Sequence, residues 1–235
     1  MTIAKADKTD DAGSVADERR GRGRPQLRCD EETRALILEA ARYEFAHSGY
    51  AATSMENVAR RASVSTKTLY RLVPNKAALF EAMVTERIEV FESTVRLRAC
   101  DGGDVEAALA EALTVCADLM LSDEVIALQR VVVGESDKFP DISSTFFHKA
   151  IAPTQTALAN WLRAQEKRGA IALDDADTAA GMLLGMLAMQ PLRATMFGHR
   201  PPPTQQERAQ RARTCAKLFL RGCRRAVAFD KLEPN

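Results

Sequence analysis

The sequence predicts an all-α protein with a small helical head and a larger helical body. Apolar residues recur every three or four positions along most of the 235-residue chain, and no segment alternates apolar and polar residues as a half-buried strand does. Two short helical patterns joined by a tight turn lie within residues 53–72, whereas later patterns are longer. We therefore expect a head at residues 30–76, a body at residues 77–228 and a tail at residues 229–235.

Residues 1–29 are polar, rich in Asp, Arg and Gly, and lack helical periodicity, which is typical of a disordered basic arm. Residues 19–28 contain five arginines and no acidic residue. The sequence Arg-Gly-Arg-Pro, from Arg22 to Pro25, resembles an AT-hook, in which arginines enter a narrow A·T minor groove. Arg22 and Arg24 are therefore candidate DNA contacts, and a tail that only adds positive charge is the alternative.

The first helix of the head is predicted to begin at Asp30. Its carboxylate can cap the free amides of the helix start, where Glu31 and Glu32 complement the helix dipole. Gly49 follows the apolar face of this helix and is a typical stop signal. The head therefore opens with one helix that ends near Gly49.

Residues 53–72 have the pattern of a helix-turn-helix. In this motif the first helix supports the second, so apolar residues fall where the helices cross and polar residues face the groove of DNA. The predicted inner seam consists of Met55, Val58, Ala59, Ala62, Val64, Leu69 and Leu72. The outer face of the second helix consists of Ser65, Thr66, Lys67, Thr68, Tyr70 and Arg71. Hydroxyl, ammonium, guanidinium and phenol groups suit base edges and phosphates, so this face fits a major groove.

Local charge favours the same interpretation, although the net charge of the whole chain is only +1. Residues 57–80 contain five basic residues and no acidic residue. A solvated face is the ordinary interpretation of a single run of this kind. Two acid-free runs beside a helix-turn-helix pattern point instead to a double-stranded DNA operator as partner.

Residues 59–79 resemble the TetR/AcrR family of bacterial transcription regulators, and the resemblance of the head extends over residues 33–80. Its specific signature is Thr-Leu-Tyr at residues 68–70, followed by Asn75 and Lys76 at the start of another helix. The resemblance implies an all-helical homodimer. In such a dimer the third helix reads DNA and the larger carboxy-terminal domain binds an inducer.

The resemblance also implies roles for individual residues. The implied phosphate or backbone contacts are Thr53, Tyr70 and Lys76, and the implied base readers are Thr66, Lys67 and Arg71. The chain departs from the family at Ser63, where glycine is common, so a non-glycine residue is expected at positive φ. Leu72 and Val73 stand where an aromatic pair is often found, so no base preference is transferred.

The first helix of the body is predicted to begin at Asn75 and to end at Gly102-Gly103. Further helices are predicted at residues 105–120, 125–134, 141–168, 175–197 and 204–227. The helix from Asn75 can link the head to the body. Within residues 141–168 we expect Phe147, Ile151 and Trp161 to face inward and Pro153 to bend the helix. The last helix opens with Thr-Gln-Gln-Glu at residues 204–207, a capping box.

The body is also expected to hold the dimer interface and the site of a small-molecule effector. Gly181 and Gly185 permit close helix approach, and the resemblance implies that the last two helices form a four-helix bundle across a two-fold axis. Ordinary packing within one chain is the alternative. Methionine and aromatic side chains suit a lipophilic effector, although each alone is more often core. The candidates are Met120, Leu128, Phe146, Phe147, Trp161, Met182 and Met186.

Other classes of site find little support. The chain has no Gly-x-Ser-x-Gly elbow, glycine-rich phosphate loop, HExxH sequence or metal-spaced cluster, so we expect no catalytic residue, cofactor or metal. Five cysteines without CxxC pairs argue against a disulfide framework. No apolar run approaches the ~20 residues of a membrane span. Because the amino terminus also lacks the apolar core of a signal peptide, a cytoplasmic location is expected.

The patterns, together with what the family resemblance implies, predict a dimeric repressor that a small lipophilic effector releases from its operator. An activator with the same head is one alternative. The other is a helical small-molecule or partner-binding protein that does not use DNA, which would require the acid-free run at residues 57–80 to be accidental.

Overall fold

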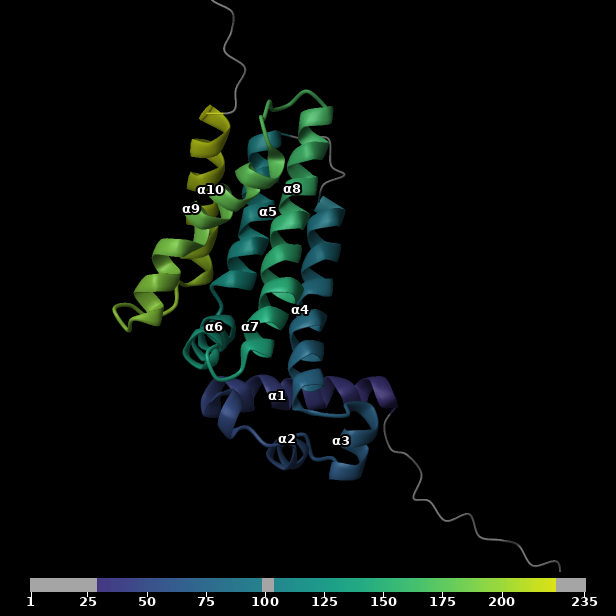
Figure 1. Ribbon diagram of the computed structural model, residues 1–235. Coiled ribbons are helices and arrows are strands. Elements are labelled where there is room, and N and C mark those ends of the chain that lie inside the picture. Colours follow the sequence, from purple (N-terminus) through teal and green to yellow (C-terminus); the bar gives the residue numbers. More distant parts are fainter. Residues whose placement is uncertain (1–28, 99–103, 223–235) are drawn as a thin grey trace, which may run out of the picture.

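The computed structural model describes residues 29–98 and 104–222, and within these ranges the regular structure is helical without strands. The predicted all-α fold is confirmed. A head of one long and two short helices lies across one end of a taller helical body (Figure 1). The arm at residues 1–28, the glycine break at residues 102–103 and the tail lie outside the described residues.

The head consists of α1 (Asp30–Ala52), α2 (Met55–Arg61) and α3 (Thr66–Leu72). Helix α1 begins at Asp30 as predicted, but its cap is Cys29 and not Asp30. Cys29 Sγ accepts the Glu32 amide at 3.4 Å, and the Glu32 carboxylate accepts the Cys29 amide at 3.3 Å. Asp30 is already helical, so its carboxylate is not the N-cap of α1.

The turn between α2 and α3 contains a non-glycine residue in the left-handed region. Ser63 has φ 55°. This positive φ was predicted, because Ser63 stands where the family commonly has glycine. The Val64 amide bonds the Ala59 carbonyl at 3.0 Å, which closes the turn. Beneath it a single apolar cluster holds the head together, and its fully buried members include Ile37, Phe45, Val58, Leu69 and Phe80.

Helix α4 (Lys76–Arg98) starts in the head and continues into the body, where it stands beside α5 (Val105–Met120) and α8 (Ala152–Lys167) (Figure 1). Helix α6 (Asp123–Glu135) packs on α1 and so forms a second connection between head and body. The apolar cluster of the head includes Val132 of α6. Head and body are therefore joined by α4 and by the α1–α6 contact.

The prediction of one uninterrupted α-helix over residues 141–168 is wrong in one respect. A π-helical turn (Phe147–Ile151), called the π-turn below, separates α7 (Pro140–Phe146) from α8. Pro153 has no amide hydrogen, and the wider turn just before it accommodates this loss. The π-turn also rotates the helix face, so Phe146 is buried while Phe147 is exposed rather than inward. Ile151 is half-exposed but borders a cavity of the body.

The last helices are α9 (Ala176–Met196) and α10 (Gln205–Gly222), which lie together at the left of the body (Figure 1). The predicted capping box is confirmed, since the Thr204 amide bonds the Glu207 carboxylate at 2.7 Å and the Glu207 amide bonds Thr204 Oγ1 at 3.2 Å. Helix α10 packs along α5 through Ala212, Cys215 and Ala216. No helix in residues 29–98 or 104–222 is both long and apolar enough to cross a membrane.

Candidate nucleic-acid interface and ligand cavity

Helix α3 presents most of its predicted contact residues to solvent. Leu69 is fully buried and anchors the helix on the head, whereas Thr66, Lys67, Tyr70 and Arg71 are exposed. Lys67 makes no hydrogen bond or ion pair with any residue that the structure describes. The exposed side of α3 is therefore polar and basic, as is expected of a helix that enters a major groove.

Ser65 and Thr68 organise the start of α3. Ser65 Oγ accepts the Thr68 amide at 3.0 Å and lies 2.8 Å from Thr68 Oγ1. Ser65 thus has the role of an N-cap, which satisfies one of the free amides of the first turn. Both hydroxyls remain near the surface, so a contact with DNA would share them with this cap.

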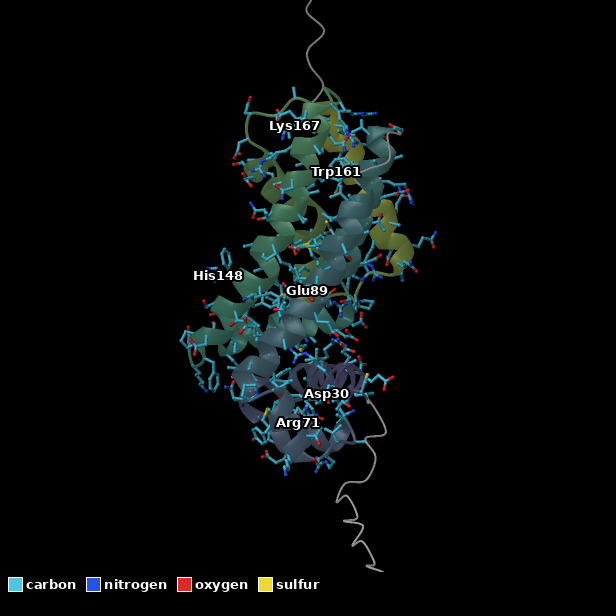
Figure 2. All side chains as sticks on the ribbon, turned by 90° about the vertical axis from the view of Figure 1, so that its right-hand side faces the viewer. Asp30, Arg71, Glu89, His148, Trp161 and Lys167 are labelled. Carbon is cyan, nitrogen blue, oxygen red and sulfur yellow. The ribbon has the colours of Figure 1, made fainter. Side chains whose placement is uncertain are left out.

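Arg71 is paired with the first residue of α1. Both terminal nitrogens of its guanidinium donate to the two carboxylate oxygens of Asp30 at 2.7 Å, and Figure 2 shows the two side chains together at the lower end of the molecule. This hydrogen bond raises the pKa of Arg71 further above its ordinary value. The sequence did not predict the pairing, because 41 residues separate the partners.

Thr53 is buried, and the partly buried Lys76 contacts the backbone of the segment that contains Thr53. Thr53 is 3% exposed, and its hydroxyl donates to the Gly49 carbonyl at 2.6 Å. Lys76 Nζ is within hydrogen-bond distance of the carbonyls of Tyr50, Ala51 and Thr53 at 2.8–3.2 Å. Both side chains therefore have a structural role, and their contact with phosphate stays a prediction. Arg22 and Arg24 lie outside the described residues.

A cavity of about 330 Å³ lies in the body beside the head. Residues of α4, α5, α6, α7, the π-turn, α8 and α9 surround it, together with Arg42 of α1. Its wall is mainly apolar and includes Met83, Val84, Ile88, Leu119, Met120, Val125, Leu128, Phe146, Leu184 and Met189. This size and lining are typical of a site for a small organic ligand.

The structure divides the residues that were predicted to contact an effector. Met120, Leu128 and Phe146 line the cavity. The remaining four do not. Trp161 is buried in the main core towards the far end of the body (Figure 2), Met186 packs against that core, and Phe147 and Met182 are exposed. Sequence periodicity could not separate these groups, because cavity and core are both apolar.

Two arginines at the cavity were not predicted, and both are already neutralised. Arg42 forms ion pairs with Glu39 and Glu86. Arg87 donates to Glu124 Oε2 at 2.7 Å and to Ser122 Oγ at 3.0 Å. The cavity therefore presents apolar surface with paired charges rather than an unpaired cation.

The thiols and acidic groups do not form a metal site within the part of the chain that the structure describes. Cys29 is exposed, while Cys116 and Cys215 are buried and unbridged. Burial raises the pKa of Cys116 to about 12 and also raises that of Cys215. Buried thiols of this kind behave as small apolar side chains.

Comparisons with known families match both parts of the molecule. Residues 37–83, which include the helix-turn-helix, match the family described as "Bacterial regulatory proteins, tetR family". Residues 107–223, which make up most of the body, match the family described as "AefR-like transcriptional repressor, C-terminal domain".

Individual proteins resemble the chain over different shares of its length. The uncharacterised HTH-type transcriptional regulator YhgD of Bacillus subtilis (strain 168) is 43% identical over 54 residues, which are 23% of this chain and 28% of YhgD. This match thus spans less than a third of that relative. A protein of Mesorhizobium loti MAFF303099 assigned to the TetR family has a similar structure, with a TM-score of 0.72 and 24% identity over 83% of this chain and 98% of its own. The flavonoid-responsive regulator FrrA has a TM-score of 0.59 and 26% identity over 82% of this chain and 97% of its own.

Proposed function

Because this chain belongs to the TetR family of bacterial transcription regulators, we propose that it is a homodimeric repressor that a small, uncharged, lipophilic molecule releases from its operator. That the chain is a DNA-binding transcription regulator follows from its family. Repression is favoured by the match of residues 107–223 to a repressor domain. The dimer, the effector and its chemical class are proposals, and each is supported by a different part of the structure.

The effector is supported by one observation, the cavity between the head-connected helices α4 and α6 and the rest of the body. Its apolar wall favours a lipophilic molecule through burial of apolar surface. Because Arg42 and Arg87 are already paired with carboxylates, an anionic ligand would have to displace these ion pairs. An uncharged molecule needs no such exchange. FrrA, which has a similar structure, is named for its response to flavonoids. Uncharged aromatic compounds are therefore the first set of ligands to test.

The dimer is supported by the outward face of α9. Met182, Met189 and Phe197 are 71%, 50% and 81% exposed, and Leu218 of α10 is 54% exposed. Apolar side chains gathered on one face commonly mark a protein interface. Gly185 of the same helix borders the cavity, and a Cβ there would meet no atom within 4 Å, so no described residue covers the backbone of α9 at that point. We therefore assign α9 the larger share of the interface, since α10 already packs along α5.

A dimer gives the effector a way to act without touching DNA. Two recognition helices must reach major grooves about 34–36 Å apart, so a change in the spacing of the heads lowers operator affinity. Helix α4 lines the cavity through Met83 and Ile88 and begins in the head at Lys76. The dimer is in equilibrium between a form whose heads fit the operator and a form whose heads do not. A ligand shifts this equilibrium away from DNA binding only if it binds the second form more tightly than the first.

The test is a DNA shift assay with genomic fragments, followed by reciprocal titration. The assay identifies the operator, and a thermal-shift screen of uncharged and anionic compounds identifies ligands. An effector must bind operator-bound protein more weakly than free protein, by the same factor by which it weakens operator binding. Equal affinity for free and operator-bound protein would contradict release by an effector. Loss of transcription on deletion of the gene would favour the activator.

A further inference from the structure

Residues 49–53 connect the first helix of the head to the helix-turn-helix. Gly49 has φ 81° and ψ 172°, so the helical backbone of α1 is broken there before Tyr50 and Ala51 form a last turn. A break of this kind leaves nearby amides and carbonyls without their usual helical partners. Two charged side chains from outside α1 supply these partners.

Glu135, the last residue of α6, binds the amides. Its Oε1 accepts the Tyr50 amide at 2.9 Å and its Oε2 accepts the Ala51 amide at 2.7 Å. A Cβ on Gly49 would lie 2.5 Å from Oε1, so a side chain there would displace the carboxylate. Gly49 is therefore required both by its positive φ and by the close approach of Glu135.

Lys76, the first residue of α4, binds the carbonyls of the same segment. Its Nζ lies 2.8 Å from the Tyr50 oxygen, 3.2 Å from the Ala51 oxygen and 3.0 Å from the Thr53 oxygen. The ammonium also lies 4.7 Å from the centre of the Tyr50 ring. Hydrogen bonds in which one partner is charged are stronger than neutral ones. The segment is thus held on its amide side by α6 and on its carbonyl side by α4.

The helices that carry Glu135 and Lys76 also line the cavity. Leu128 of α6 lies two turns before Glu135, and Met83 of α4 lies two turns after Lys76. At a rise of 1.5 Å per residue, each cavity residue is about 10 Å along its helix from the charged side chain. A helix transmits a displacement over this distance as a nearly rigid body.

We propose that Glu135 and Lys76 act together as a clamp on residues 49–53, and that this clamp carries the state of the cavity to the helix-turn-helix. When an occupant shifts α6 relative to α4, the two charged groups move apart or along the segment, and α2 and α3 move with it. Glu135 and Lys76 are positioning residues in this scheme, since neither contacts the occupant. The inference rests on the proposed function, because it requires that filling the cavity weakens DNA binding.

A double-mutant cycle on the full-length protein tests the clamp without an identified effector. Ala188→Leu, from the buried wall on α9, fills part of the cavity in place of a ligand. In the wild-type background it should weaken operator binding by about tenfold, within the usual range of allosteric coupling. In a Glu135→Ala background the same substitution should weaken operator binding by less than about twofold. Glu135→Gln, which keeps one acceptor oxygen, should give an intermediate effect.

The controls separate a clamp from a loss of structure. Asp137→Ala removes a carboxylate two residues further along and should leave the tenfold effect intact. Leu184→Phe is a second filling substitution at another buried cavity residue of α9, and circular dichroism and sedimentation show whether each variant is folded and dimeric. If the filling substitution weakens binding equally with and without Glu135, the clamp is overturned while the proposed function stands. If neither filling substitution changes operator affinity, the effector-release proposal fails and the clamp fails with it.

Discussion

The guanidinium of Arg71 and the carboxylate of Asp30 tie the end of the recognition helix to the first residue of α1 through two hydrogen bonds of 2.7 Å. Asp30 therefore fixes the direction in which Arg71 leaves α3. A guanidinium held in one orientation loses less side-chain entropy when it binds a base edge or phosphate. The same carboxylate places a negative charge near any approaching phosphate.

Replacement of Arg71 by alanine should relax sequence choice at one position of each half-site, at a cost of roughly 1–3 kcal/mol per contact. Asp30→Ala should instead raise the affinity for non-operator DNA and lower the ratio of operator to non-operator affinity, because it frees Arg71 and removes a repelling charge. Binding to all single-base operator variants measures both effects. An unchanged preference in Arg71→Ala would show that this residue does not read a base.

Lys76→Ala should lower the free energy of unfolding by roughly 1–3 kcal/mol, because three backbone carbonyls lose their charged donor. Urea unfolding measures this loss. Lys67→Ala is the matched control, since Lys67 is exposed and should affect DNA binding but not stability. If Lys76 is a phosphate contact instead, its removal would lower the slope of operator affinity against salt by about one ion per monomer while stability is unchanged.

Deletion of residues 1–28 should reduce affinity mainly for operators with A·T flanks, because the arginines of this segment are predicted to enter a narrow minor groove. Fluorescence anisotropy with operators that differ only in their flanks measures the difference. An equal loss on G·C flanks would show that the arm contributes only nonspecific charge.

Cysteine reactivity should divide the thiols by burial. With a pKa of about 12, Cys116 has at pH 8 a thiolate fraction of about 10⁻⁴, and its side chain is also inaccessible. Iodoacetamide should therefore modify the exposed Cys29 in the folded protein and reach Cys116 and Cys215 only after unfolding. Mass spectrometry of the digested protein checks this order, and rapid labelling of Cys116 in folded protein would contradict its burial.

The local features of this protein follow from its sequence alone. Helical periodicity placed most helices of the body, and the apolar seam with its polar outer face placed the helix-turn-helix. The Thr204–Glu207 capping box was also predictable from the residues themselves, and the positive φ of Ser63 was predictable from the family resemblance. Each depends on residues within a few positions of one another, where backbone sterics and helix-end hydrogen bonds dominate.

The tertiary structure decided which partner each polar group has. The Asp30–Arg71 pair, the Glu135–Tyr50 bond and the Lys76 contacts join residues 23 to 85 positions apart, and no local pattern specifies such pairs. It also decided that Phe146 rather than Phe147 faces the cavity, because a π-turn before Pro153 shifts the helical register. Periodicity marks a residue as apolar, but only the packing of whole helices determines whether it lines a core, a cavity or an exposed face.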